Sequence, residues 1–150
     1  MKNLFEADRV EELKERLTLL RSDSERLWGS MNASQAVAHC ALSLESAVGD
    51  RLPPRKLLGR VLGRLIKPLV LRNDEPMRRN SPTVKDLIVG DDRDLKVERE
   101  RLFRLIDRFV AAGSKGCTTH PHSFFGRLTP EEWAILMYKH LDHHLRQFGV

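Results

Sequence analysis

The residues best suited to chemistry lie near the end of the chain, where three of the six histidines fall within five positions. His140 and His144 are four residues apart, a spacing that places both imidazoles on one face of a helix, one turn apart. The same face carries the apolar residues that such a helix buries: Trp133, Leu136, Met137, Leu141 and Phe148. We therefore predict that His140 and His144 point inward. His143 lies about 100° away and is expected to be a supporting or surface residue.

Two inward histidines on one helix would form a metal centre if a third ligand lay opposite them. His39 is the only histidine on another predicted helix, and it lies in the middle of that helix. Three imidazole nitrogens bind a divalent ion and leave a coordination position for water or substrate. Zinc, nickel and iron(II) all accept imidazole, so the residues do not choose among these ions. The predicted metal ligands are His39, His140 and His144.

Each of these histidines also needs an acceptor for the N–H of its other ring nitrogen. The side chains of Asp142 and Tyr138 and the backbone carbonyls are candidates, and the sequence does not rank them. The alternative to a metal centre is a pair of partly buried imidazoles with hydrogen-bond partners, or a helix end where positive charge suits the dipole. His120 and His122 are expected to be solvated loop residues.

Apolar periodicity predicts four helices long enough to build a core. The clearest local signal is Thr129–Glu132, where a threonine N-cap, a proline at the first position and a glutamate form a capping box. The other helices are predicted at about 8–21, from residue 32 or 34 to about 48, and at about 94–112. No useful strand-like alternation appears. We therefore expect an all-α four-helix bundle with one long crossover, forming a single domain over residues 1–150.

The long crossover lies between the second and third of these helices. Pro53–Pro54 begins it, a short amphipathic helix is predicted at about 55–67 and limited by Pro68, and residues 71–92 are expected to be an irregular surface connection. The short helix could lie on an anionic membrane surface or bind a partner helix. Such segments more often pack as a lid on their own domain, and we expect this third arrangement.

Charge is concentrated in the crossover. Residues 51–79 contain nine lysines and arginines but only Asp74 and Glu75 as acids. No nucleic-acid-binding motif accompanies them, so a solvated basic face and no nucleic-acid partner are expected. Gly59 and Gly63 have the spacing of a transmembrane GxxxG motif, but the arginines around them exclude a membrane-spanning helix.

Composition indicates a globular protein, with 41% hydrophobic and 31% charged residues and a formal net charge of +5. No apolar run approaches the ~20 residues needed to cross a bilayer, and the first residues do not form a signal peptide. We therefore expect a cytoplasmic protein without a membrane partner. Cys40 and Cys117 lie far apart without a CxxC motif and are expected to be free thiols.

Three stretches of the chain resemble the DinB/YfiT-like superfamily. Residues 140–147 (HLDHHLRQ) resemble its C-terminal motif, in which two histidines four residues apart are followed by a short run ending in glutamine. Residues 31–39 (MNASQAVAH) resemble its second-helix segment. Residues 120–133 (HPHSFFGRLTPEEW) are similar to a subgroup known only as a domain of unknown function.

This resemblance implies a four-helix bundle with one long crossover, frequent dimerisation and a divalent metal centre on His39, His140 and His144. Characterised members of the superfamily include transferases and isomerases that use low-molecular-weight thiols such as bacillithiol, mycothiol or glutathione. The implied function is therefore a metal-dependent thiol S-transferase with a small-molecule substrate. The basic segment 51–79 would then attract the carboxylates of the thiol.

Two other functions remain open from the sequence. A metal ion could activate water for hydrolysis without any thiol. Alternatively, the protein could bind a metal or a small ligand as a stress protein without turnover. The residues do not distinguish these functions from thiol transfer.

Overall fold

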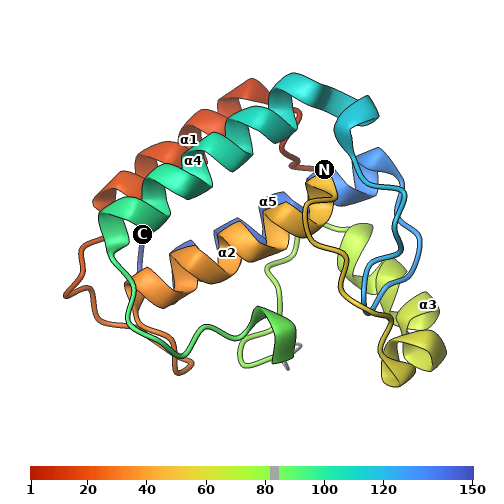
Figure 1. Ribbon diagram of the computed structural model, residues 1–150, viewed down its shortest axis with the longest axis horizontal. Helices are drawn as coiled ribbons and strands as arrows, with labels where there is room; N and C mark the ends of the chain where they lie inside the picture. The colour runs from red at the N-terminus through yellow and green to blue at the C-terminus, as the bar shows by residue number, and fades with distance from the viewer. Residues whose placement is uncertain (82–84) are drawn as a thin grey trace.

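The computed structural model describes residues 1–81 and 85–150, and these residues form five α-helices and no strand. The helices are α1 (Ala7–Leu19), α2 (Ala33–Val48), α3 (Leu57–Leu71), α4 (Leu95–Ala112) and α5 (Pro130–Gln147) (Figure 1). Two short 3₁₀ turns occupy Lys85–Leu87 and Gly113–Gly116. The all-α prediction is confirmed.

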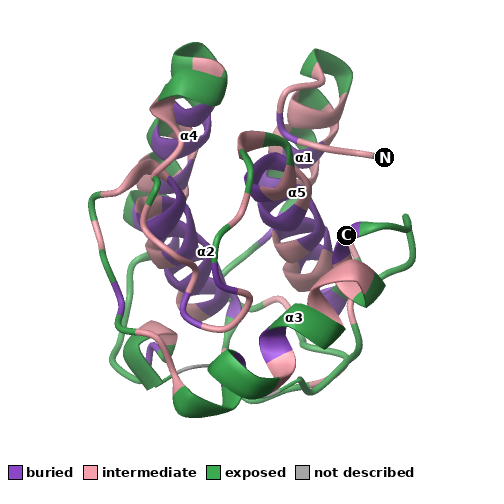
Figure 2. Ribbon diagram, turned by 90° about the vertical axis from the view of Figure 1, so that its right-hand side faces the viewer, coloured by how far each residue is buried: buried purple, intermediate pink, exposed green. Residues whose placement is uncertain are grey.

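Four of the helices, α1, α2, α4 and α5, pack on one another and are called the core helices below. The central one is α2, which contacts α4 along its length and α5 on another side, while α1 contacts both α4 and α5. Most residues of α2 are buried, and Figure 2 shows buried residues concentrated where the core helices face each other. Several of its inward residues are alanines, which allow a close approach of neighbouring helices: Ala33, Ala36, Ala41 and Ala47.

Capping boxes fix the starts of the two helices that carry the predicted ligands. In α2 the side chain of Asn32 accepts from the backbone N–H of Gln35, whose side chain accepts from the backbone N–H of Asn32. The same reciprocal pair joins Thr129 and Glu132 at the start of α5. Each cap satisfies two backbone donors that would otherwise lack partners. The register of both helices is therefore set by local sequence.

The helix of the crossover is longer than predicted, because α3 continues through Pro68 to Leu71. Proline removes one backbone donor, which leaves the carbonyl of Arg64 without its helical partner; Arg64 is exposed, so water can take that place. The buried amine of Lys139 on α5 donates to the carbonyls of Val70 and Asn73 and so stabilises the end of α3. The prediction that Pro68 ends the helix was wrong for this reason.

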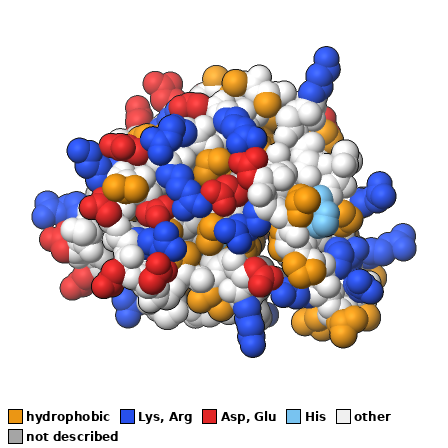
Figure 3. Space-filling model, in the orientation of Figure 1, with side chains coloured by type: hydrophobic (Ala, Val, Ile, Leu, Met, Phe, Trp, Pro, Cys, Tyr) orange, Lys and Arg blue, Asp and Glu red, His pale blue; other side chains and the backbone are white. Residues whose placement is uncertain are grey.

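The packing of α3 also differs from that of the core helices. Its buried residues are Gly59, Gly63 and Leu71, and the two glycines lie against the backbone of Phe124. The helix does pack on its own domain, as expected, but through its glycines. Its larger apolar side chains face outward, and hydrophobic groups gather over α3 at the lower right of Figure 3.

The rest of the crossover is irregular at residues 72–81 and 88–92, as predicted, apart from the 3₁₀ turn between them; residues 82–84 lie outside the description. Val89 is buried, so this connection covers part of the core helices. None of the helices in the described ranges has the length and apolar character that crossing a membrane requires.

Candidate metal centre

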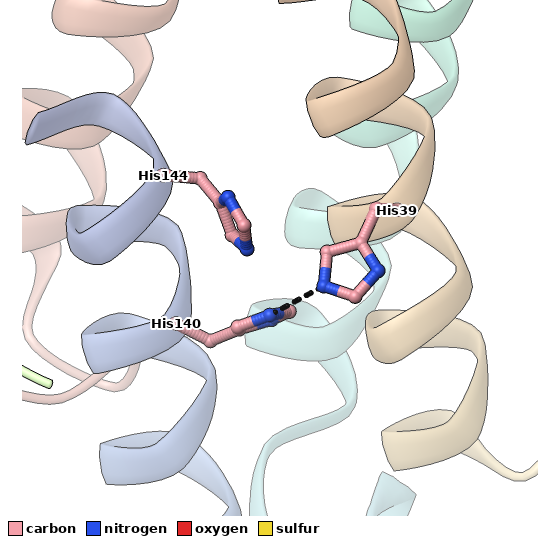
Figure 4. A group of neighbouring side chains, drawn as sticks. All are labelled: His39, His140 and His144. Atoms are coloured by element: carbon pink, nitrogen blue, oxygen red, sulfur yellow. Dashed lines mark hydrogen bonds between the residues drawn. The ribbon is translucent and has the colours of Figure 1, made fainter. Parts of the chain in front are cut away.

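The three predicted ligands come together between α2 and α5. His39 projects from the middle of α2 toward His140 and His144, which lie one turn apart on the facing side of α5 (Figure 4). One ligand atom from each ring lies within 4.8 Å of the others. His39 is buried, whereas His140 and His144 keep partial contact with solvent.

The ring of His39 is held in one orientation by a backbone carbonyl of the crossover. Its Nδ1 lies 2.7 Å from the carbonyl oxygen of Leu87, which can only accept, so Nδ1 carries the proton and donates. The lone pair is then on Nε2, which faces Nε2 of His140 at 2.8 Å. An orienting bond of this kind is the usual companion of a metal-binding histidine.

His144 is oriented by a side chain of its own helix. Its Nδ1 lies 2.8 Å from Oε1 of Gln147, and the amide nitrogen of Gln147 donates to the carbonyl oxygen of Trp28 at 2.7 Å. That second bond fixes which end of the amide is the oxygen. Nδ1 of His144 must therefore donate, which leaves a lone pair on Nε2.

The arrangement fits a small divalent ion. Tetrahedral nitrogen ligands at about 2.0–2.1 Å from an ion lie about 3.4 Å from one another. The closest pair, Nε2 of His39 and of His140, would have to separate by roughly half an ångström from its 2.8 Å contact. The proton that His140 now shares with His39 would move to Nδ1 of His140. Nitrogens as far apart as 4.8 Å would have to approach each other by up to about 1.4 Å.

The electrostatics keep all three imidazoles neutral. Burial lowers the pKa of His39 and lowers that of His140 further, with the neighbouring histidines adding to the effect on His140. Burial and His39 lower the pKa of His144 to about 3. Neutral imidazole is the form that donates a lone pair to a metal, so the three rings are ready to bind at neutral pH.

The fourth histidine of this region, His143, lies beside the three and not among them. Its ring centroid is 5.1 Å from that of His144 and 5.7 Å from that of Trp28. The guanidinium carbon of Arg79 lies 4.2 Å from the centroid of the Trp28 ring. His143 is half-buried, in agreement with a supporting role, and it links the three histidines to a tryptophan that carries a cation.

Two histidines that were expected to be solvated are partly buried instead. His122 packs on Phe125 and Trp133, and its Nδ1 accepts from the backbone N–H groups of Phe124 and Phe125. Burial lowers its pKa to about 4. Nε2 of His120 lies 3.1 Å from the carbonyl oxygen of Pro53. The loop folds back under α3, which the local sequence does not indicate.

The cysteines are free thiols, as expected, and Cys40 is buried in the core beside His39 in sequence. Burial raises the pKa of Cys117 to about 11 and that of Cys40 further. Neither thiol is therefore a thiolate at neutral pH. Trp133 and Phe148 are core residues as expected, whereas Trp28 is only partly buried.

The acceptors that orient the rings were only partly anticipated. Asp142 pairs with Arg16 and Arg146, and the hydroxyl of Tyr138 has no hydrogen-bond partner among the described residues. A backbone carbonyl does accept from His39, but the sequence does not indicate which one, because that depends on the path of the crossover. Gln147 had a signal, since it lies three residues after His144 on the same helix.

Comparison with known protein families gives a match over nearly the whole chain. The sequence profile of a family described as "Protein of unknown function (DUF1569)" matches residues 3–149 and so includes all three clustered histidines. No curated protein and no solved structure matches the chain.

Proposed function

The chain belongs to this family, DUF1569, and we propose that its clustered histidines His39, His140 and His144 bind one divalent metal ion and that the protein is a metal-dependent thiol S-transferase. The core helices would then be a four-helix bundle of the DinB/YfiT-like type, with α3 in the long crossover. One observation carries the proposal: the three neutral imidazoles converge, and Nδ1 of two of them is already committed to an acceptor.

Three imidazole ligands leave a fourth coordination position, which would allow catalysis and not only a structural role. His140 and His144 are partly exposed, which supports access of a small molecule to this side of the centre. When bound, the divalent ion supplies electrostatic stabilisation to the thiolate of a low-molecular-weight thiol, or, in a hydrolase, lowers the pKa of water toward ~7. The protein residues hold the ion, fix the three rings and set the approach of the substrate.

The surroundings favour thiol transfer over hydrolysis. Hydrolysis is helped by a general base beside the attacking water. The nearby acid Asp142 is engaged by Arg16 and Arg146, so the imidazole of His143 beside His144 is the group left to act as such a base. A thiolate is a nucleophile without such a base. This favours a substrate that carries its own nucleophile.

The cation beside the centre supports an anionic thiol. Arg79 stacks on Trp28, and Trp28 contacts His143 next to His144. Nε1 of Trp28 is buried without a partner among the described residues. A thiol with carboxylates would pair with Arg79 while its sulfur faces the three histidines.

Metal content is the first test. The protein, purified without a histidine tag and reconstituted with zinc, nickel or iron(II), should hold about one equivalent of one metal by elemental analysis. His140→Ala and His144→Ala should each reduce this below about 0.1 equivalent, because the variant keeps only His39 and one other imidazole as ligands. His120→Asn is the matched control outside the centre and should keep the metal. A wild type without bound metal would contradict the proposal.

Turnover is the second test. The metal-loaded protein should consume a low-molecular-weight thiol in the presence of an electrophile panel, and the His144→Ala variant should not. Arg79→Gln should raise the KM for an acidic thiol and leave the metal content unchanged. A metal-loaded protein that consumes no thiol with any electrophile would instead favour a binding protein without turnover.

A further inference from the structure

A stripe of apolar side chains on α3 is exposed to solvent. The five residues are between 63% and 78% exposed, whereas most apolar residues of the core helices are buried: Leu57, Leu58, Val61, Leu65 and Leu69. At 100° per residue they fall within about 120° of the helix circumference. This set is called the α3 stripe below.

The α3 stripe faces outward because the opposite face of the helix is fastened down. A Cβ at Gly59 would lie 2.6 Å, and one at Gly63 2.1 Å, from backbone atoms of Phe124. Lys67 bonds to the carbonyl of Arg127 and pairs with Glu132 of α5. The helix therefore cannot rotate its apolar side onto the domain without losing these contacts.

The charge around the α3 stripe is of one sign. The helix contains no acid, and residues 51–79 carry nine basic residues against two acidic ones. Arg60 and Arg64 are exposed next to the stripe, and neither forms an ion pair within residues 1–81 and 85–150. Figure 3 shows Lys and Arg side chains around the hydrophobic group at the lower right, whereas acidic side chains lie mainly on the other side of this view.

We propose that the α3 stripe docks the protein on an anionic lipid bilayer. The leucines and the valine would enter the boundary between head groups and acyl chains, while Arg60 and Arg64 would bind lipid phosphates at the surface. A helix with this composition lies in the plane of a membrane and does not cross it, in agreement with the absence of a spanning helix in the described chain.

Charge argues against the obvious competitor, a second copy of the chain. An isologous contact through the α3 stripe would bring Arg60 and Arg64 of both copies together without any acid of α3 to pair with them. An anionic surface supplies the missing charge. The sequence-based expectation of no membrane partner assumed that the apolar side of this helix would pack on its own domain, and that side is exposed instead.

Vesicle sedimentation tests this inference and is independent of any metal. The full chain should bind vesicles of phosphatidylcholine with phosphatidylglycerol at low salt, and should bind vesicles of phosphatidylcholine alone much more weakly. Leu58→Gln/Leu65→Gln should raise the half-saturating lipid concentration by about tenfold or more. Arg60→Gln/Arg64→Gln should raise it on the order of 30-fold.

Matched controls distinguish binding through the α3 stripe from nonspecific binding through other exposed apolar or basic residues. Leu19→Gln/Val97→Gln changes two exposed apolar residues of α1 and α4, and Lys96→Gln/Arg104→Gln removes two exposed charges of α4. Both should bind like the wild type, and circular dichroism should show the same helix content in every variant.

Three outcomes would overturn the inference. The wild type could fail to bind anionic vesicles, which would leave the α3 stripe to a protein partner. The arginine variant alone could lose binding, which would show a surface contact without insertion. Sedimentation velocity could reveal a dimer that Leu58→Gln/Leu65→Gln dissociates, which would assign the stripe to a second copy.

Discussion

The α2–α5 pair and α3 contain similar apolar residues but bury opposite faces of their helices. In α2 and α5 the apolar side chains face inward and carry three histidines with them into the interior. In α3 the apolar side chains face outward, and glycines make the contact with the domain. All three helices show the same kind of amphipathic pattern. The difference teaches that periodicity finds a helix with two unlike faces, but does not say which face is buried.

The largest expected difference between the two regions is in the loss of stability caused by a leucine-to-alanine substitution. Leu44→Ala in α2, where the side chain is 0% exposed, should lower the free energy of unfolding by about 2–5 kcal/mol. Leu65→Ala in α3, where it is 70% exposed, should change it by less than about 0.5 kcal/mol. Urea denaturation followed by circular dichroism measures both.

A comparable loss for the two leucine variants would break the comparison. It would mean that the α3 stripe is covered in the folded protein in solution. Repeating the measurement at several protein concentrations distinguishes a second copy from a local rearrangement, because only the former depends on concentration.

The loop between the two regions gives the next largest effect. His122 contacts Trp133 of α5, and the neighbouring Phe124 contacts the glycines of α3. Burial, with a smaller contribution from Arg55, lowers the pKa of His122 from its usual 6.5 to about 4. The unfolded chain therefore takes up this proton first as pH falls. Stability should be unaffected by His122 above pH 6.5 and should decrease progressively between pH 6.5 and pH 4.

His122→Asn isolates this contribution. The amide oxygen of asparagine can accept from the N–H groups of Phe124 and Phe125 in place of Nδ1, but it does not titrate. The wild type should lose up to about 3 kcal/mol more than the variant between pH 6.5 and pH 4, measured by urea denaturation at each pH. Parallel pH profiles would show that His122 is solvated in the native state.

The core helices could be predicted from sequence because several signals agreed. The capping box at Thr129 and the apolar residues around His140 and His144 gave the same register for α5. His39 was predicted as the third ligand because it is the only histidine on another predicted helix and lies in the middle of α2. Because the caps and the apolar periodicity agreed, the sequence could predict that His39, His140 and His144 lie together.

The rest depended on contacts that no local pattern encodes. The carbonyl of Leu87 reaches His39 only because the crossover returns over α2, and the burial of His122 depends on how its loop meets α3 and α5. The spacing of Gly59 and Gly63 does not by itself distinguish a membrane motif from a close approach to another backbone. Outside a membrane, too, a helix can approach another backbone closely only where it carries glycines without side chains.

A smaller effect tests the support of the metal centre itself. Gln147→Ala removes the acceptor of the Nδ1 proton of His144 and should weaken metal affinity by about 10- to 100-fold, measured by competition with a chelator. Arg146→Ala is the neighbouring control, because Arg146 is exposed and contacts Asp142 instead of a histidine. Equal affinities in both variants would show that the orientation of His144 is set by packing alone.

Gly63→Ala should change overall stability little, and it tests the attachment of α3. Alanine favours a helix over glycine by up to about 1 kcal/mol, but its Cβ would meet the carbonyl oxygen of Phe124 at 2.1 Å. The two effects oppose each other, so global unfolding should shift by less than about 1 kcal/mol, since the core helices are untouched. The backbone amide hydrogens of α3 should nevertheless exchange with solvent at least about tenfold faster, because the helix loses its close contact with the backbone of Phe124.

Gly90→Ala is the control. With no atom within 4 Å of its Cβ, it should leave the exchange of the α3 amides unchanged. If α3 loosens while the metal content stays at one equivalent, the two regions are energetically separate; if the metal is lost as well, the crossover that supplies the carbonyl of Leu87 couples them.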